Sequence, residues 1–251
     1  MNLQGNTILI TGGSSGIGRG LAEALHLRGN QVVVTGRREE RLRELCAAHA
    51  GMRYFTLDVT DPAAIRDVAV RAVAQFPALN CVFNNAGVQR AGSAAPESLD
   101  DGALVREVET NLLGPIRVAA AFLQHLRTRP DATLLNVSSG LAFVPIARFP
   151  VYCATKAAIH SWTLSLRRQL QGSSVRVIEL IPPYVATELG GTGKPATGAG
   201  GRGPMPLDAF IAETLNELEM EADEIAIAAA KNLASAACSG NVRKVFASMN
   251  S

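Results

Sequence analysis

Short aliphatic runs alternate with longer amphipathic stretches along most of the chain, and this alternation limits the fold more than any other feature. The first run, Thr7–Thr11, ends at glycines, and apolar residues then recur at helical spacing from Ile17 to Leu25. Further strands are expected at residues 32–34, 54–57, 81–83, 133–137 and 175–178. Strands that alternate with helices through short connections form a parallel sheet with right-handed crossovers. The pattern therefore predicts a doubly wound α/β sheet of the Rossmann type, in three α/β/α layers.

The composition fits one such domain over residues 1–251. Hydrophobic residues make up 47% of the chain and charged residues 18%, so a large core can form. The net charge of +2 gives no electrostatic reason to expect nucleic acid or a membrane surface as a partner. No apolar stretch is long enough to span a bilayer, and the four cysteines have no metal-ligand spacing. We expect a soluble, cytoplasmic protein without a bound metal.

Glycines, polar residues or a proline follow the ends of several expected strands. Glycines follow the first strand, Asn84 the fourth, Ser139 the fifth and Pro182 the sixth. In doubly wound sheets, ligands bind beyond the carboxyl ends of the strands. We therefore expect the functional site at this edge, although Asn84 could equally stabilise the central sheet.

The turn after the first strand has the composition of a phosphate-binding loop. Its glycines allow the backbone to approach a pyrophosphate closely, and the helix that begins near Gly16 directs free N–H groups at the negative charge. A tight strand–helix turn can use glycine without binding anything, but the position of this turn and its two serines favour a dinucleotide site. The residues expected to contact the cofactor here are Gly12, Ser14, Ser15, Gly16, Ile17 and Gly18.

The end of the second strand indicates which nicotinamide dinucleotide is bound. A carboxylate there would repel a 2′-phosphate, whereas this chain has Gly36-Arg37-Arg38. Two guanidinium groups would form charge-assisted hydrogen bonds with that phosphate. The arginines could instead be solvated residues that start the next helix beside Glu39 and Glu40, although cations oppose the dipole at a helix start. We expect NADP(H) in preference to NAD(H), with Arg37 as the main ligand and Arg38 as its helper.

Tyr152 and Lys156, one helical turn apart, form the expected proton-transfer group. Such a pair alone could be two surface residues, but the phosphate loop and Ser139, thirteen residues before Tyr152, favour a catalytic role. Free tyrosine titrates near pH ~10, and a nearby ammonium favours its phenolate form. In the reductive direction, hydride would pass from the nicotinamide to a carbonyl carbon while Tyr152 protonates the carbonyl oxygen.

Four motifs in a fixed order carry a family resemblance: TGGSSGIG at residues 11–18, NNAG at 84–87, SS at 138–139 and YCATK at 152–156. From about residue 5 to residue 190 the chain resembles the short-chain dehydrogenase/reductase family. Two further stretches, GRREERL and PPYVATEL, are similar to a branch that includes reductases near D-alanine esterification operons. The resemblance implies a Rossmann fold, hydride transfer and a homodimer or homotetramer.

The resemblance also implies roles for single residues. Ser139 would hold the reacting oxygen, Lys156 would also bind the nicotinamide ribose, and Asn111 would position a water in a proton relay. Asn111 could instead bond backbone inside a helix, and Asp58 could cap a local turn rather than border the adenine. The chain departs from the family where Pro183 replaces a glycine. The other residues that the resemblance implies at the cofactor are Asp58, Val59, Asn85, Ala86, Gly87, Tyr152, Lys156, Pro182, Val185 and Thr187.

The Gly- and Pro-rich residues 190–206 are either a disordered linker or part of a lid over the site. The resemblance favours a mobile substrate lid of about residues 188–220. Helices are expected at 207–220 and 222–237, and a last strand at 242–247. The expected pocket wall consists of Leu141, Phe143, Val144, Ile146, Phe149, Tyr184 and Leu189.

This mostly apolar wall favours a neutral ketone, aldehyde or secondary alcohol as substrate, with Arg90 and Arg148 as exposed loop charges. A catalytically silent NADP(H)-sensing or scaffold protein is the alternative from another class. A sensor would need none of the phenol chemistry, so the intact Ser139, Tyr152 and Lys156 argue against it. An epimerase of the same superfamily would generally carry a larger C-terminal substrate domain.

Overall fold

The computed structural model describes residues 1–92, 100–189 and 203–250. Within these residues, seven strands form one parallel sheet in the order β3-β2-β1-β4-β5-β6-β7. The strand order reverses between β1 and β4, which is where doubly wound sheets form their ligand crevice. The predicted fold is therefore confirmed. The strands are β1 Thr7–Thr11, β2 Gln31–Gly36, β3 Arg53–Thr56, β4 Leu79–Asn84, β5 Ala132–Val137, β6 Val175–Ile181 and β7 Glu224–Ala226.

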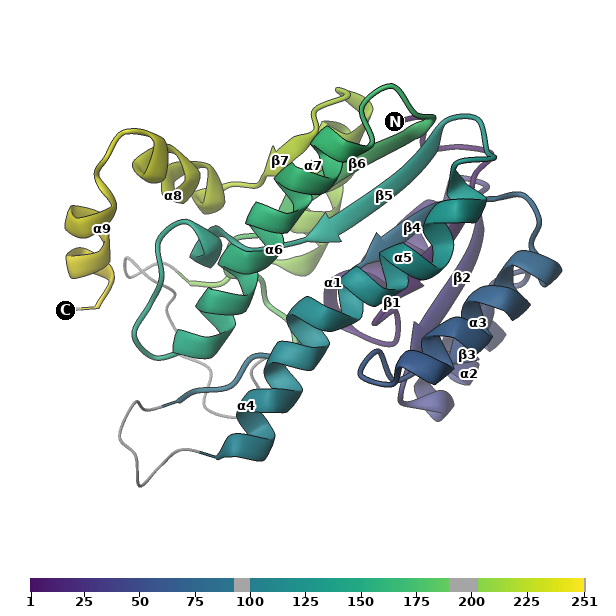
Figure 1. Cartoon of the computed structure of the whole chain (residues 1–251), viewed down its shortest axis with the longest axis horizontal. Helices are drawn as coiled ribbons and strands as arrows, with labels where there is room; N and C mark the ends of the chain where they lie inside the picture. Colours follow the sequence, from purple (N-terminus) through teal and green to yellow (C-terminus); the bar gives the residue numbers. More distant parts are fainter. Residues whose placement is uncertain (93–99, 190–202, 251) are drawn as a thin grey trace.

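Helices cover both faces of this sheet (Figure 1). The α-helices are α1 Gly16–Leu27, α2 Glu39–Ala48, α3 Pro62–Gln75, α4 Asp101–Val108, α5 Gly114–Leu126, α6 Pro150–Gln169, α7 Leu207–Glu219, α8 Ala229–Cys238 and α9 Val242–Met249. Residues of α1, α2 and α7 share one buried cluster with the sheet, and residues of α3, α5 and α6 share the other. None of the helices in the described ranges is both long and apolar enough to cross a bilayer.

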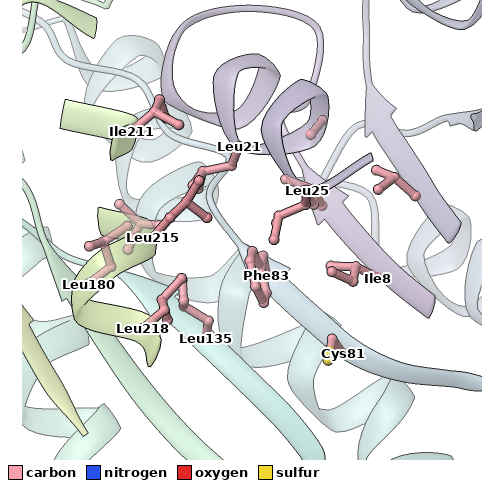
Figure 2. Close-up of a cluster of buried hydrophobic side chains, with 14 of the residues drawn as sticks. Ile8, Leu21, Leu25, Cys81, Phe83, Leu135, Leu180, Ile211, Leu215 and Leu218 are labelled. Carbon is pink, nitrogen blue, oxygen red and sulfur yellow. The ribbon is translucent and has the colours of Figure 1, made fainter. Parts of the chain in front are cut away.

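The two clusters arise because strand residues alternate between the faces of the sheet. On β4, Phe83 packs toward α1 and α7, while its neighbour Val82 packs toward α3 and α5. Figure 2 shows Phe83 among aliphatic side chains of α1, α7 and the neighbouring strands. The helix starts follow local chemistry. Asp61, for example, caps α3 by accepting from the backbone N–H groups of Ala63 and Ala64.

The C-terminal region differs from the expectation in two places. The expected helix at 222–237 is divided into β7 and α8. Glu224–Ala226 pairs with the end of β6 and forms the edge strand of the sheet. The expected strand at 242–247 is wrong: Val242–Met249 is a helix. Its apolar residues Val242, Val245, Phe246 and Met249 recur at the spacing of a helix rather than of a strand.

The expected lid falls partly outside the described residues, because 190–202 are not among them. The helix expected at 207–220 is present as α7, and its Phe210 and Leu215 are buried in the core beside α1. Before it, Met205 bonds to the backbone of Tyr184 and Ala186 just after β6. The C-terminal part of the predicted lid is thus anchored to the core.

Candidate active site

A cavity of about 1440 Å³ lies beyond the carboxyl ends of the strands. The sequence-predicted residues line it with two exceptions, Gly18 and Asn111. Those that line it are Gly12, Ser14, Ser15, Gly16, Ile17, Arg37, Arg38, Asp58, Val59, Asn85, Ala86, Gly87, Ser139, Tyr152, Lys156, Pro182, Val185 and Thr187. The fold therefore brings these residues, from six connections after different strands, to one cavity.

The glycine loop packs directly against the segment that follows β4. Gly12 has a φ of +68°, and a Cβ there would lie 2.8 Å from the Ala86 Cα. A Cβ on Gly18 would lie 2.3 Å from the Asn85 Nδ2. Gly18 is therefore needed for the approach of Asn85 and does not itself face the cavity.

The asparagines at the end of β4 and directly after it, Asn84 and Asn85, have structural contacts. Asn85 donates through Nδ2 to the Thr11 carbonyl at 2.9 Å, and the Thr11 hydroxyl accepts from the N–H groups of Asn85 and Ala86. Asn84 donates to the Asn136 Oδ1 at 2.9 Å inside the sheet. These bonds fix the glycine loop relative to β4, and they agree with the sheet-stabilising alternative for Asn84.

The two arginines after β2 lie in different surroundings. Arg38 donates to the Ser15 hydroxyl at 2.7 Å, to the Ser14 hydroxyl at 3.3 Å and to the Glu188 carboxylate at 3.2 Å. In the described part of the chain, the approach of Arg37 to an acidic group is 3.9 Å, between its Nη1 and the Asp58 Oδ2. Arg38 thus joins the glycine loop to the segment after β6, while Arg37 remains available at the rim.

Asp58 forms a local turn, which was the alternative to its predicted position beside the adenine. Its Oδ1 accepts from the N–H of Thr60 at 3.0 Å and from the Thr60 hydroxyl at 2.9 Å. Its Oδ2 is the atom that faces Arg37. One carboxylate oxygen is therefore used in the turn, and the predicted contact with adenine stays a prediction.

Ser139, Tyr152 and Lys156 meet at one end of the cavity. Ser139 follows β5 and begins a short 3₁₀ turn, while Tyr152 and Lys156 lie one turn apart near the start of α6. All three are buried, and the Lys156 Nζ lies 5.7 Å from the centre of the Tyr152 ring. The Lys156 Nζ donates to the Val137 carbonyl at 2.8 Å.

Burial dominates the electrostatics of this group. Burial raises the pKa of the Tyr152 phenol well above its usual range, and a hydrogen bond with Ser139 only partly opposes this rise. Burial also lowers the pKa of Lys156 to about 8, against the opposing effect of the Glu179 charge. The Lys156 ammonium is turned to Val137. The raised pKa of Tyr152 favours the protonated phenol at neutral pH.

Asn111 lies in a π-helical segment, Glu109–Leu113, that separates α4 from α5. Its side chain is fully buried and exchanges two 2.8 Å hydrogen bonds with the backbone of Val88. Its Nδ2 also lies 3.2 Å from the Thr155 hydroxyl, next to Lys156. This segment interrupts the regular α-helical run at Asn111. The amide holds the segment after β4 against α6, so the relay role stays a prediction.

The substrate side of the cavity agrees only in part with the expected wall. Leu141, Ile146, Phe149, Tyr184 and Leu189 line it. Phe143 and Val144 do not: Val144 is fully buried, and the Phe143 ring packs on His160 at 4.5 Å between centroids. Arg90 and Arg148 are exposed, as expected, and also border the cavity.

Residues from the C-terminal helices complete this wall, and the sequence analysis missed them. The contributors are Ala228, Ala229, Ala230, Leu233, Ser248, Met249 and Asn250. Asn250 accepts a hydrogen bond from the backbone N–H of Ala147 in the loop after β5. For the last of these residues, Ser248, Met249 and Asn250, the helical spacing within residues 242–249 was the sequence signal that could have indicated the helix.

A second omission is Glu179, a fully buried carboxylate in β6 that lies 2.8 Å from the Nδ1 of His160 on α6. A charged residue within the aliphatic strand Val175–Ile181 is the sequence signal that could have revealed it.

Comparison with known proteins agrees with this geometry. A family model described as short chain dehydrogenase matches residues 6–196. The uncharacterized oxidoreductase DltE of Bacillus subtilis is 43% identical over 192 residues, which are 75% of each chain.

Solved structures extend the similarity to the whole chain. A short chain dehydrogenase from Burkholderia cenocepacia in complex with NADP has a TM-score of 0.85 at 27% identity and covers 100% of both chains. A short chain dehydrogenase/reductase from Burkholderia phymatum in complex with NAD has a TM-score of 0.79 at 23% identity, covering 90% of this chain and 89% of that one. The second likeness supports the fold alone. With the family model, the relative and the shared fold in agreement, the chain belongs to the short-chain dehydrogenase family of oxidoreductases and is similar to the DltE branch.

Proposed function

We propose that this protein is an NADP(H)-dependent oxidoreductase that interconverts a carbonyl compound and a secondary alcohol. The observation that carries the proposal is the convergence of Ser139, Tyr152 and Lys156 in the same cavity as the glycine loop. A dinucleotide with its phosphates at that loop could extend toward the tyrosine. No such arrangement would be needed in a protein that only binds a nucleotide.

The proposed roles follow from the contacts of each side chain. A bound nicotinamide would supply or accept the hydride. In the reductive direction, Tyr152 donates its phenolic proton to the carbonyl oxygen, because its raised pKa keeps it protonated. Ser139 holds the same oxygen in line. Lys156 binds the nicotinamide ribose and stabilises the phenolate once the proton has left, and Asn111 maintains the segment through which that proton is replaced.

The proposed preference for NADP(H) rests on charge. Arg37 and Arg38 border the cavity beyond the end of β2, and the cavity-lining carboxylates that approach them, Asp58 and Glu188, face Arg37 and Arg38 themselves. A 2′-phosphate there would gain charge-assisted hydrogen bonds. The NADP complex of the Burkholderia cenocepacia relative supports this choice. The remaining predicted cofactor residues would contact the pyrophosphate, the ribose or the carboxamide.

We propose a neutral, fairly apolar substrate, because aliphatic and aromatic side chains predominate on the substrate side. We also propose that the predicted lid of about residues 188–220, of which 190–202 lie outside the described residues, covers the substrate. A homodimer or homotetramer is proposed from α4 and α6, where Val105 and Leu164 are exposed apolar residues. Light scattering on the purified protein distinguishes these assemblies from a monomer.

The decisive experiment is a screen of ketones and aldehydes for NADPH oxidation at 340 nm. Activity should disappear in Tyr152→Phe, while the Kd for NADPH changes less than about threefold, because the phenol oxygen is needed for the proton and not for the phosphates. Substantial activity in Tyr152→Phe would refute the role of the phenol. Tight NADPH binding with no turnover across a broad panel would favour the sensor alternative.

A further inference from the structure

A row of buried polar side chains crosses the sheet beneath the catalytic helix. Asn84, Asn136 and Glu179 occupy matching positions on β4, β5 and β6. Each is at most 3% exposed. Parallel strands covered on both faces are normally apolar throughout, so this row requires a function or a compensating set of partners.

Two of the three have neutral partners, although the Oδ1 of Asn84 has no hydrogen-bond partner among the described residues. Asn84 donates to Asn136, and Asn136 donates to the Thr163 hydroxyl on α6 at 3.0 Å. Glu179 is different, because its side chain is a carboxyl group and is 0% exposed. Among the described residues, His160 is the only side chain that hydrogen-bonds to this carboxylate, with its Nδ1 2.8 Å from Oε2 and 3.1 Å from Oε1.

This pairing favours the protonated imidazole more than water does. An ionised carboxylate out of water is very costly unless a partner neutralises it. Correspondingly, the hydrogen bond with Glu179 raises the pKa of His160 above its usual value. The imidazole of His160 also packs against the Phe143 ring, with 4.5 Å between the ring centroids. Phe143 belongs to the loop that begins at Ser139.

The pair lies one helical turn beyond the catalytic lysine. Tyr152, Lys156 and His160 are spaced four residues apart on α6 and therefore share one face of the helix. The Lys156 ammonium is held by the Val137 carbonyl, and Val137 is next to Asn136, the cross-strand neighbour of Glu179. Of the charged groups in the described residues, Glu179 is the one whose field opposes the loss of the Lys156 proton.

The other charges around this cluster have their own partners. On α6, Arg167 pairs with Glu224 of β7 at 3.1 Å, and both act on His160 at longer range. Asp223 pairs with Arg176 at 2.8 Å. From α4, Glu107 acts on Tyr152 and Cys153. None of these replaces Glu179 as the counter-charge of Lys156.

We propose that Glu179, held in place by His160, is a positioning residue that keeps the buried Lys156 protonated and fixes the catalytic face of α6 against the loop of Ser139. The carboxylate touches neither substrate nor cofactor. It acts through the lysine and through the helix. The proposal rests on the proposed function only for its consequence in catalysis, because the charge state of Lys156 can be measured without turnover.

The test is an NMR titration of protein labelled at the lysine ε-carbons. The chain has four lysines, at positions 156, 194, 231 and 244, and Lys156→Met assigns the resonance of Lys156. In the wild type, the midpoint of this resonance should lie near 8. In Glu179→Gln, which keeps the shape and removes the carboxylate, the midpoint should fall measurably below the wild-type value.

Two further variants make the result specific. Glu224→Gln removes a carboxylate from the cross-strand neighbour of Glu179 and should leave the Lys156 midpoint unchanged. His160→Val with Glu179→Ala removes both members of the pair, leaves no unpaired charge and gives a second route to the same measurement if Glu179→Gln folds poorly. This double variant should also lower the midpoint.

Enzymatic activity supplies the second readout. With a carbonyl substrate in hand, the alkaline limb of the kcat/KM profile for NADPH-dependent reduction should move to lower pH in Glu179→Gln, in parallel with the NMR midpoint. An unchanged Lys156 midpoint in the folded Glu179 variants would overturn the inference. A lowered midpoint in a protein with no oxidoreductase activity would uphold it and reject the proposed function instead.

Discussion

Replacing Arg37 and Arg38 by alanine, singly and together, tests the cofactor preference directly. The Arg37 side chain is 53% exposed, and its 3.9 Å approach to Asp58 is too long for a hydrogen bond. Its guanidinium can therefore turn to an incoming phosphate at little cost. Arg38 is 47% exposed but already bonds to the serines of the glycine loop and to Glu188.

The expected magnitude follows from these surroundings. A hydrogen bond to a charged group contributes about 1.5–3 kcal/mol, and half-exposed side chains belong at the lower end because water screens them. Since about 1.4 kcal/mol corresponds to a factor of ten in Kd, Arg37→Ala should weaken NADPH binding about tenfold. Its Kd for NADH should change less than about twofold, because NADH lacks the 2′-phosphate.

Arg38→Ala should show a less selective pattern. It should weaken NADPH binding by about tenfold and NADH binding by about threefold, because the loop serines lose a partner. The double variant should lose about 100-fold for NADPH if the two residues act independently. Arg41→Ala is the matched control: Arg41 bonds to Glu188 at 2.7 Å but does not line the cavity, so both Kd values should stay within about twofold.

Isothermal titration calorimetry with both dinucleotides measures the wild type and the four variants. The decisive quantity is the ratio of the two Kd values, since a general loss of folding affects NADPH and NADH alike. Equal weakening of both by Arg37→Ala would refute the reasoning, as would a wild-type protein that binds NADH as tightly as NADPH.

Two further predictions concern stability. Lys156 has a pKa of about 8 against 10.5 for the exposed side chain, so below pH 8 its buried charge costs on the order of 3 kcal/mol. The folded chain binds fewer protons than the unfolded chain between these two values, so wild-type stability should rise across that range. Lys156→Met should therefore be the more stable protein at pH 7 in urea unfolding, with an advantage that shrinks toward pH 10.5; a constant advantage would contradict the assignment. Gly18→Ala places a methyl group 2.3 Å from the Asn85 amide and should cost about 1–3 kcal/mol in the same assay. Gly102→Ala is the matched control, because Gly102 is also helical and a Cβ there would meet nothing closer, among the described residues, than the Asp100 Oδ1 at 3.4 Å. Equal costs at the two glycines would exclude the proposed clash.

Much of the fold could be predicted because its signals are local. The alternation of aliphatic runs with helical spacing gave six strands of the sheet within a few residues of their observed bounds, and Asp61 caps its helix through its own backbone neighbours. β7 could not be predicted, because a strand of three residues, Glu224–Ala226, is too short to show a periodic pattern. Their strand character comes from pairing with β6.

The candidate site divides in the same way. The sequence by itself determined that a glycine loop follows β1 and that Tyr152 and Lys156 share a helix face, because spacing along a strand or helix fixes direction. Only the tertiary structure decided that the Lys156 ammonium turns to Val137, that Arg38 bonds to the glycine loop, and that Glu179 meets His160. Each of these contacts joins residues that lie far apart in the chain or depends on burial. No local pattern encodes either condition, because burial and proximity exist only once the layers have packed.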